Sequence, residues 1–448
     1  MKSIAIIGAG ITGLTAAFYL KCKKASISFF EAGDRAGGVI RSVRENGFLA
    51  EFGPNTTLET SPKISQLIAD LGLESRRLYT DPNAKKRYLV RDRKPVALPS
   101  SPLGFVTTPL FSLGAKMAVL RESFVPPRRS DADESVADFV QRRLNREFLE
   151  RAVDPMVSGI YAGVPERLSV RHALPRLYDL EQKYGSLIRG QIFGAGERKR
   201  RGEVARSHAK MFSFDEGLQV LPDALVARLG DSLRLNTPVS KLVRTQNGWR
   251  VFFPDGKQEF DVVIYCAPAH KLAGLQLDKI DLSIFSKIRH PPVASVVLGF
   301  RRADVAHPLD GFGMLVPRQE NFQILGAIFS SSLFPNRAPA GHVTLTSYIG
   351  GERNPELALK PQEELISMTK TDLRTLLGVK GEPVFQHVAF YPQAIPQYNI
   401  GYGRFKDAFN EIESNSPGLF FAGSYRDGIS LGDSIVSGAN IASRVEKY

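Results

Sequence analysis

The N-terminal segment that ends at Glu31 carries the pattern that most limits how this chain can fold. Residues 3–7 form a continuous apolar run, residues 14–20 have helical spacing, and residues 26–30 form a second apolar run that leads directly into Glu31. The segment between the first run and the helix reads Gly8, Ala9, Gly10, Ile11, Thr12 and Gly13. Strand, glycine loop, helix, strand and acid in this order predict a βαβ unit that binds a dinucleotide.

Each part of this unit has its own task in that prediction. Gly8 permits the tight turn, Gly10 lets the backbone approach a pyrophosphate, and Gly13 allows the helix to pack closely on the strand. The free N–H groups of the helix N-terminus bind the phosphates. Glu31 accepts hydrogen bonds from the ribose hydroxyls.

A second short motif favours FAD over NAD as the dinucleotide. Arg35 is followed by the pair Gly37 and Gly38, which lets a second loop approach the cofactor and brings a cation near its phosphates. Large flavoproteins often carry this extension, which NAD domains do not usually need. A turn further along consists of Gly53, Pro54, Asn55 and Thr56. Its backbone N–H groups are expected to lie against the flavin ring, and a plain turn is the alternative.

Later segments complete a split nucleotide domain. Residues 260–268 are a buried-strand run that ends in a turn, and residues 236–239 lead into another strand that brings Val239 beside the adenine. Residues 418–423 form a last strand and a turn that ends at Gly423. The segment with Ile429, Ser430 and Leu431 then leads into a helix of small residues over 434–445. The N-terminus of such a helix can face the flavin edge where negative charge develops on reduction.

Composition excludes several other classes of protein. The chain has 448 residues, enough for two to four domains. Its two cysteines, Cys22 and Cys266, exclude a disulfide framework. Seven scattered histidines and no metal-ligand spacing predict no metal site. The net charge of +13 implies attraction to anions, and without a nucleic-acid-binding motif we expect no nucleic acid partner.

Two long segments interrupt the nucleotide domain. The first starts with 21 uncharged residues between Lys94 and Lys116, whose four prolines are incompatible with one spanning helix. A helix with an acidic first turn is expected over 133–140, and residues 189–210 are strongly basic, which indicates a solvated surface or a contact with anionic lipid. In the second segment we expect strands over 293–300, 311–316, 324–329 and 343–349.

Four further motifs resemble one known family. The most specific is the run from Asp154 to Gly163, which is followed by residues 165–169. Residues 86–90, 311–317 and 395–398 support it. The chain resembles the oxygen-dependent, FAD-containing protoporphyrinogen oxidases, within the amine-oxidase-like flavoproteins, over essentially its whole length.

The resemblance implies an α/β fold in three parts. A split Rossmann-type FAD domain would comprise residues 1–81, 214–278 and 397–448. An α+β substrate domain would comprise residues 82–98, 190–213 and 279–396. A helical, membrane-associated domain would comprise residues 99–189. The absence of a leader before the first strand leads us to expect a cytoplasmic protein, peripherally attached to the inner face of the cytoplasmic membrane.

The resemblance also implies roles for individual residues. Arg87 would pair with a substrate propionate, while Leu315, Ile328 and Tyr348 would sandwich the tetrapyrrole. The cavity would be lined by the segment that contains Gly159, Tyr161 and Gly163. The FAD contacts would be those named above together with Tyr391, which stands where some relatives have Trp. Tyr348 stands where relatives often have Phe.

The implied reaction removes six electrons from protoporphyrinogen IX in three flavin cycles, with O₂ as acceptor and H₂O₂ as product. No side-chain base is needed, so no catalytic side chain is predicted. Expected partners are the porphyrinogen, O₂ and anionic lipid, with ferrochelatase or another downstream haem-pathway enzyme as candidate acceptor of the porphyrin and a homodimer as candidate assembly. The alternatives are oxidation of coproporphyrinogen III, an amine oxidase or carotenoid desaturase, and a non-catalytic FAD or porphyrin carrier.

Overall fold

The structure is a computed structural model that describes residues 2–194 and 209–448. One half is built on a parallel sheet with the strand order β10-β2-β1-β14-β21. These strands are β1 (Ser3–Ile7), β2 (Ser26–Phe30), β10 (Leu233–Arg234), β14 (Val262–Tyr265) and β21 (Leu419–Phe421). Because all pairs in the sheet are parallel, the loops that follow their carboxyl ends lie along one edge. The βαβ unit predicted from the sequence is confirmed.

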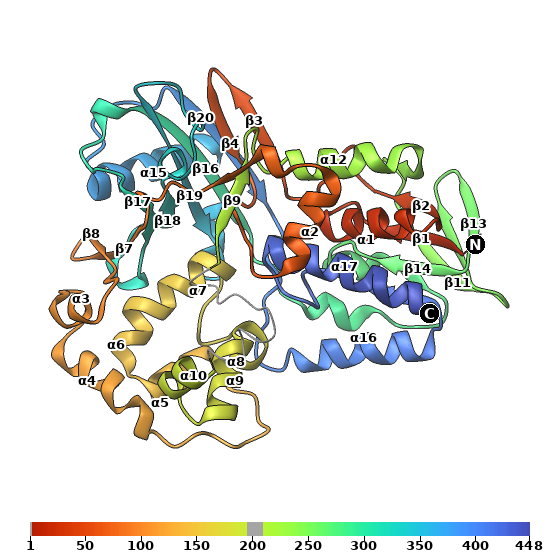
Figure 1. Ribbon diagram of the computed structural model, residues 1–448, viewed down its shortest axis with the longest axis horizontal. Helices are drawn as coiled ribbons and strands as arrows, with labels where there is room; N and C mark the ends of the chain where they lie inside the picture. Colours follow the sequence, from red (N-terminus) through yellow and green to blue (C-terminus); the bar gives the residue numbers. More distant parts are fainter. Residues whose placement is uncertain (1, 195–208) are drawn as a thin grey trace.

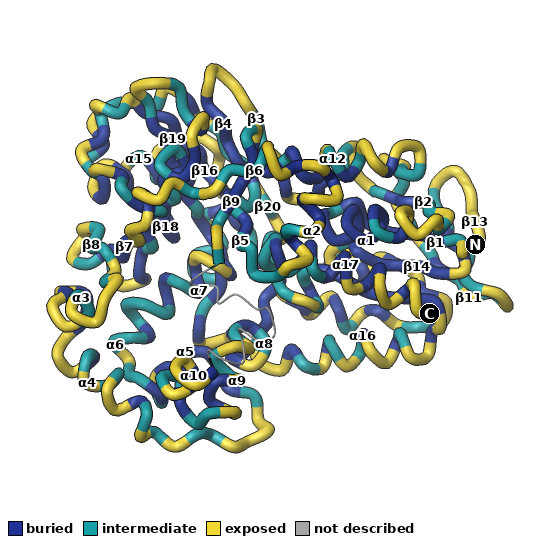
Figure 2. The backbone as a smooth tube through the Cα atoms, viewed as in Figure 1, coloured by how far each residue is buried: buried dark blue, intermediate teal, exposed yellow. Residues whose placement is uncertain are grey.

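Both faces of this sheet are covered, as Figures 1 and 2 show. Ile4 and Ile6 of β1 pack among helices on one face, whereas Ala5 and Ile7 pack toward Trp249 on the other. The helices are α1 (Ile11–Cys22), α2 (Pro62–Leu71), α12 (Val220–Leu229) and α17 (Leu431–Lys447). The other face carries β11 (Lys241–Arg244), β12 (Trp249–Phe253), β13 (Gly256–Phe260), β15 (Gln276–Leu277) and α16 (Gly403–Asn415). A strand buried on both faces explains the continuous apolar run at residues 3–7.

The other half contains a seven-stranded sheet with the order β20-β16-β19-β18-β17-β7-β8. Its strands are β7 (Lys86–Arg91), β8 (Lys94–Ala97), β16 (Val293–Arg301), β17 (Gly311–Leu315), β18 (Ile324–Ile328), β19 (His342–Gly350) and β20 (Phe385–Tyr391). Only the β7–β17 pair is parallel. One face packs against helix α15 (Gln362–Leu377) through residues such as Leu298, Leu345 and Leu373. The four predicted strands of this region are confirmed within about one residue.

Two small sheets join these halves, and two short helices pack on the seven-stranded sheet. They are β3 (Ser42–Glu45) with β4 (Phe48–Glu51), then β5 (Thr57–Leu58) with β9 (Met211–Phe214) and β6 (Arg77–Tyr79), then α13 (Ser330–Leu333) and α14 (Pro355–Ala358). Asn46 and Gly47 connect β3 to β4 with φ of +50° and +80°. Positive φ at both positions is what a tight hairpin turn requires.

Residues 102–193 form a group of short helices at the lower left of Figure 1. They are α3 (Pro102–Thr107), α4 (Leu113–Arg121), α5 (Val136–Arg143), α6 (Arg146–Phe148), α7 (Asp154–Tyr161), α8 (Val170–Ala173), α9 (Pro175–Tyr184) and α10 (Leu187–Phe193). A π-helical turn, η3 (Leu149–Val153), connects α6 to α7. Among the described residues, none of the helices has both the length and the apolar character that crossing a bilayer requires.

Two expected boundaries are wrong. The C-terminal helix begins at Leu431 rather than residue 434, because Ser430 and Asp433 form a capping box. Helix α5 begins after Ser135, whose side chain accepts the Asp138 N–H, so the two acids before it lie outside the helix. The strand into which residues 236–239 lead begins at Lys241, as expected. The arginine-rich residues 198–201 lie outside the described part of the chain.

Candidate functional site

The loop between β1 and α1 has a closed inner side and an open outer side. Gly8 has a φ of +100°, and a Cβ on it would lie 2.6 Å from the backbone nitrogen of Ala267. A Cβ on Gly13 would overlap the carbonyl oxygen of Gly8. At Gly10, by contrast, no atom lies within 4 Å of the Cβ position. The first two positions require glycine for packing, whereas Gly10 leaves space in front of the loop.

The N-terminus of α1 fits the pyrophosphate of FAD. Its N-cap is Gly10, and no side chain caps the first N–H groups of the helix, which include those of Ile11 and Thr12. The N-terminus of α17, in comparison, is capped by Ser430. Uncapped N–H groups and the helix dipole attract an anion, and the open space at Gly10 admits one. The residues present therefore fit the FAD that the sequence predicts.

Glu31 joins this loop to the end of β2. Its Oε2 accepts the Ala9 N–H at 2.7 Å, and its Oε1 accepts the Gly33 N–H at 2.8 Å. The adjoining segment lies close by, because the Thr237 N–H donates to the Glu31 carbonyl at 2.8 Å. Val239 follows two residues later and is partly buried. The expected contacts of Glu31 with ribose and of Val239 with adenine remain predictions.

A second loop lies against the first. The Gly37 N–H donates to the Ala9 carbonyl at 2.8 Å, and a Cβ on Gly38 would lie 3.3 Å from Gly10 Cα. Arg35 donates to the carbonyl oxygens of Ala36 at 3.0 Å and Ile40 at 3.1 Å, and also to that of Gly38. The Arg35 guanidinium therefore holds the backbone of its own loop in this structure.

The loops that follow the carboxyl ends of the parallel strands lie along one edge of that sheet, which we call the cofactor edge. The turn formed by residues 53–56 connects the cofactor edge to the seven-stranded sheet. A Cβ on Gly53 would overlap the carbonyl oxygen of Val39, so this turn packs on the second loop. Asn55 Nδ2 donates to the Tyr348 hydroxyl at 2.7 Å. Thr56 precedes β5, and Pro54 occupies the middle of the turn. A predicted cofactor segment and a predicted substrate residue are thus in direct contact.

The C-terminal segment reaches the same edge. Gly423 follows β21, and its N–H donates to Ser437 Oγ at 3.1 Å. The Thr12 hydroxyl of α1 donates to the Ser434 carbonyl of α17 at 3.1 Å. The N-terminal turns of the two helices therefore lie together. Ile429 and Ser430 directly precede α17 and Leu431 is its first residue, so all three adjoin the turn of α17 that contacts α1.

Four of the predicted substrate residues lie on one face of the seven-stranded sheet. In one cross-strand row, Arg87, Gly313, Ile328 and Thr346 are neighbours. In the next row, Leu89, Leu315, Gly326, Tyr348 and Ser295 are neighbours. The two rows are two residues apart on every strand that they share, so their side chains point to the same side of the sheet. We call this side the site face; α15 covers the opposite one.

The remaining positions differ in their relation to the site face. Tyr391 joins it at the edge, because it pairs with Val293, two residues from Ser295; burial raises the pKa of Tyr391. Arg87 is exposed, lies 6.0 Å from the Phe312 ring centroid, and has no ion-pair partner among the described residues. A cation at the rim of an apolar face can bind a carboxylate.

Helix α7 approaches the site face through Gly159. A Cβ on Gly159 would overlap Leu315 Cδ2. The Tyr161 hydroxyl donates to the Ala173 carbonyl at 2.7 Å, so this ring is directed into the helical region. Gly163 packs on the Gln397 side chain. Of these three residues, Gly159 therefore contacts Leu315, whereas Tyr161 and Gly163 contact other parts of the chain.

A buried ion pair that sequence reasoning missed holds α7 to the sheet. Arg353 Nη2 lies 2.9 Å from Asp154 Oδ2 and donates to Ser158 Oγ at 2.7 Å, while Arg353 Nη1 donates to the Val316 carbonyl at 2.9 Å. Arg318 adds a contact of 3.3 Å to Asp154. The signal for this pair in the sequence was Asp154, the acid at the start of the run from Asp154 to Gly163.

A buried carboxyl group was also missed. Glu51 precedes the turn at residues 53–56 and accepts the Ser42 hydroxyl at 2.6 Å and the Leu218 N–H at 2.8 Å. Burial raises the pKa of Glu51 to about 7, although Arg337, at 3.8 Å, acts in the opposite direction. Its position at the end of a fully buried strand was the signal in the sequence.

Comparison with known proteins agrees with this geometry. A profile of the family described as flavin containing amine oxidoreductase matches residues 11–446. Protoporphyrinogen oxidase 2 of Arabidopsis thaliana is 35% identical over an alignment that covers 100% of this chain and 94% of that protein. Coproporphyrinogen III oxidase of Bacillus subtilis is 29% identical, with coverages of 100% and 98%. A crystal structure from Exiguobacterium sp. 255-15, provisionally described as a protoporphyrinogen oxidase, has a TM-score of 0.85 at 25% identity, with coverages of 100% and 99%.

The fold and the cofactor edge define an FAD-dependent oxidoreductase. The chain belongs to the flavin containing amine oxidoreductases, and its cofactor is FAD. Within the described ranges, no group of three or more His, Cys, Asp or Glu side chains is placed to hold a metal ion.

Proposed function

We propose that this chain oxidises protoporphyrinogen IX to protoporphyrin IX with O₂ as acceptor. The observation that carries the proposal is the site face, on which Arg87, Leu315, Ile328 and Tyr348 share two adjacent rows beside the cofactor edge. A porphyrinogen is a large apolar ring with anionic propionates. A broad apolar face with one rim cation suits such a ligand. The family relatives named above support the same reaction.

The residues of the chain bind and orient the substrate in this proposal. Arg87 pairs with a propionate, and Leu315, Ile328 and Tyr348 hold the ring against the cofactor edge. The hydrogen bond from Asn55 fixes the Tyr348 ring relative to the turn at residues 53–56. FAD, when bound, accepts two electrons in each cycle. Three cycles remove six electrons and six protons from the ring, and three O₂ become three H₂O₂.

Oxidation of coproporphyrinogen III is the second candidate. The coproporphyrinogen III oxidases of Bacillus subtilis and Staphylococcus aureus are 29% and 30% identical over almost the whole chain. Coproporphyrinogen III carries four carboxylates rather than two. It therefore requires more cations near the site face than Arg87 alone.

Steady-state kinetics with both substrates tests the proposal. We expect kcat/KM to be higher for protoporphyrinogen IX than for coproporphyrinogen III. Arg87→Ala should raise KM about tenfold with little change in kcat, because a charged hydrogen bond is worth about 1.5–3 kcal/mol. Lys94→Ala, a charge removal at the other end of the same hairpin, is the control. A higher kcat/KM for coproporphyrinogen III would transfer the assignment to the second candidate.

We further propose that the helical region rests on the inner face of the cytoplasmic membrane. Large apolar side chains are exposed there, including Leu103 at 74%, Leu113 at 75% and Phe124 at 81%. Such side chains on short helices suit an interfacial contact with lipid. A homodimer and delivery of the porphyrin to ferrochelatase remain predictions.

A further inference from the structure

A positively charged hollow opens between two loops of the helical region. It has a volume of about 550 Å³ and lies between the segments 123–129 and 182–185, with Arg189 of α10 at its side. Arg129, Lys183 and Arg189 line it, and none of its lining residues is acidic. Arg129 and Arg189 are exposed. The hollow therefore presents several cationic groups to solvent.

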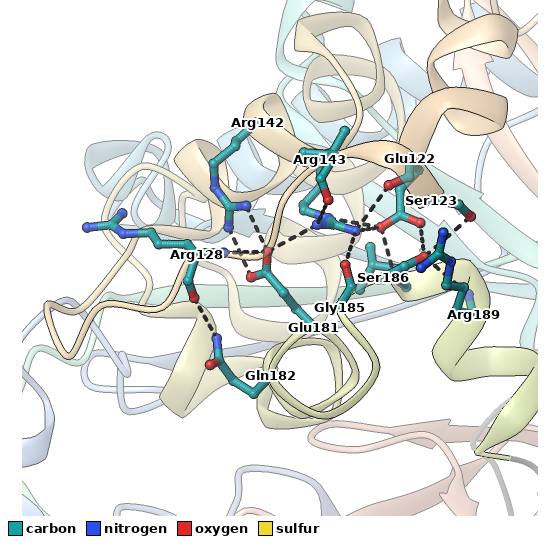
Figure 3. A network of polar contacts seen from close by, with 12 residues as sticks. Glu122, Ser123, Arg128, Arg142, Arg143, Glu181, Gln182, Gly185, Ser186 and Arg189 are labelled. Carbon is teal, nitrogen blue, oxygen red and sulfur yellow. Dashed lines mark hydrogen bonds and ion pairs between the residues drawn. The ribbon is translucent and has the colours of Figure 1, made fainter.

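A buried ion network, drawn in Figure 3, lies beside the hollow and connects its two walls. Arg143 is completely buried; its Nη1 donates to the Val125 carbonyl at 2.9 Å and its Nη2 to the Gly185 carbonyl at 3.1 Å. One guanidinium thus binds a carbonyl from each wall. The hollow is consequently formed before any ligand arrives.

The same network neutralises the nearby carboxylates. Glu122 accepts from Arg143 Nε at 2.9 Å, and Glu181 accepts from Arg142 Nη1 at 2.7 Å. The side chains of Glu122 and Glu181 are at most 1% exposed. Because these two carboxylates are buried and already paired with Arg142 and Arg143, they do not compete with an anion from solvent for Arg129 and Arg189.

The rim of the hollow is apolar. Phe124 is 81% exposed and belongs to the lining itself. Ile192, which is 65% exposed, lies one helical turn beyond Arg189 and therefore on the same side of α10. Cations inside and exposed apolar side chains at the edge complement a molecule with a phosphate and hydrocarbon chains.

We propose that this hollow binds the phosphate of an anionic phospholipid, with the acyl chains against Phe124 and Ile192. The proposal rests on the membrane contact proposed above and names its lipid. Arg129 and Arg189 bind the phosphate oxygens, and Arg143 is a positioning residue that acts through the two walls. The hollow thereby selects an anionic headgroup, which general hydrophobic adsorption does not.

Calorimetric titration of the FAD-loaded protein with monomeric dihexanoyl-phosphatidylglycerol tests this site. We expect one saturable site whose affinity falls at least tenfold in Arg129→Ala/Arg189→Ala, because each charged hydrogen bond contributes about 1.5–3 kcal/mol. Arg121→Ala/Lys94→Ala removes the same charge outside the hollow and should bind within twofold of the unchanged protein. Phe124→Ser should weaken binding of the lipid but not of inorganic phosphate.

The outcomes separate the lipid site from the other proposals. Equal affinity for inorganic phosphate and for the lipid would show a free-anion site and overturn the assignment. Equal losses in the two double variants would show general charge attraction and would also overturn it, as would no binding at all. Porphyrinogen turnover in detergent is measured in parallel. It should stay unchanged in the hollow variants, so failure of the lipid site is distinguishable from failure of the enzymatic proposal.

Discussion

At the residue scale, the conformation of the cofactor loop depends on the absence of a side chain at Gly13. Its Cα faces the carbonyl oxygen of Gly8 so closely that a methyl group would overlap it. The overlapped atom belongs to the backbone of the phosphate loop, so no side chain can move aside to relieve the contact. This close contact explains why the third glycine position of the sequence motif must be glycine.

Gly13→Ala is therefore expected to abolish FAD binding. The loop must shift to admit the methyl group, which misplaces the N–H groups of the first turn of α1. The ratio of flavin to protein absorbance after purification measures this loss. Gly114→Ala is the matched control, because Gly114 lies exposed in helix α4 and a Cβ there meets no atom closer than 3.7 Å. Retention of full flavin content by Gly13→Ala would contradict the role of the contact.

Glu51 makes stability depend on pH. Its pKa is about 7 in the folded chain against an ordinary value of 4.5, so the folded state holds the proton more tightly than the unfolded state. The free energy of unfolding should therefore fall as pH rises from about 4 to about 8 and then level off. Glu51→Gln lacks this titration. Its stability relative to the unchanged chain should rise by about 3 kcal/mol across that range, measured by urea unfolding. Parallel pH profiles for the two proteins would contradict the assignment.

At the element scale, helix α7 and strand β17 are fitted to each other. Gly159 faces the end of Leu315, and the ion pair between Arg353 and Asp154 holds the helix there. Because Leu315 Cδ2 belongs to a flexible side chain, an alanine at position 159 would displace that side chain rather than prevent folding. The displaced group lies on the site face.

Gly159→Ala is accordingly expected to raise the KM for protoporphyrinogen several-fold while FAD content stays normal. A shorter residue in place of Leu315 should relieve the overlap, so Gly159→Ala/Leu315→Val should recover part of the lost affinity. Steady-state kinetics of the two single variants and the double variant gives the coupling free energy between positions 159 and 315. Strictly additive effects would show that the two positions do not interact.

The elements that the sequence predicted well are those with strong local patterns. Strand β1 follows from an uninterrupted apolar run because it is buried on both faces. The start of α17 was missed because the capping box at Ser430 and Asp433 extends the helix into a segment expected to be loop. Boundaries depend on single side-chain hydrogen bonds, which periodicity does not reveal.

At the scale of the whole molecule, the site depends on contacts between distant parts of the chain. Asn55 and Tyr348 are 293 positions apart and share a hydrogen bond of 2.7 Å. The glycine motif predicts one side of the site, and the resemblance predicts residues of the other. Neither the motif nor the resemblance predicts that Arg87 and Ile328 lie in one row of the sheet. Their position follows from the register in which the strands pair. The division into three parts with the stated boundaries remains a prediction.

The most direct measurement is anaerobic mixing of the purified FAD-loaded protein with protoporphyrinogen IX, followed by admission of air. We expect the visible absorbance of the flavin to bleach with this substrate and to return in air, with porphyrin fluorescence and H₂O₂ as products. A parallel experiment with coproporphyrinogen III should give slower bleaching. A flavin that stays oxidised with both porphyrinogens, in a protein that still binds FAD, would contradict the proposed oxidation of porphyrinogens.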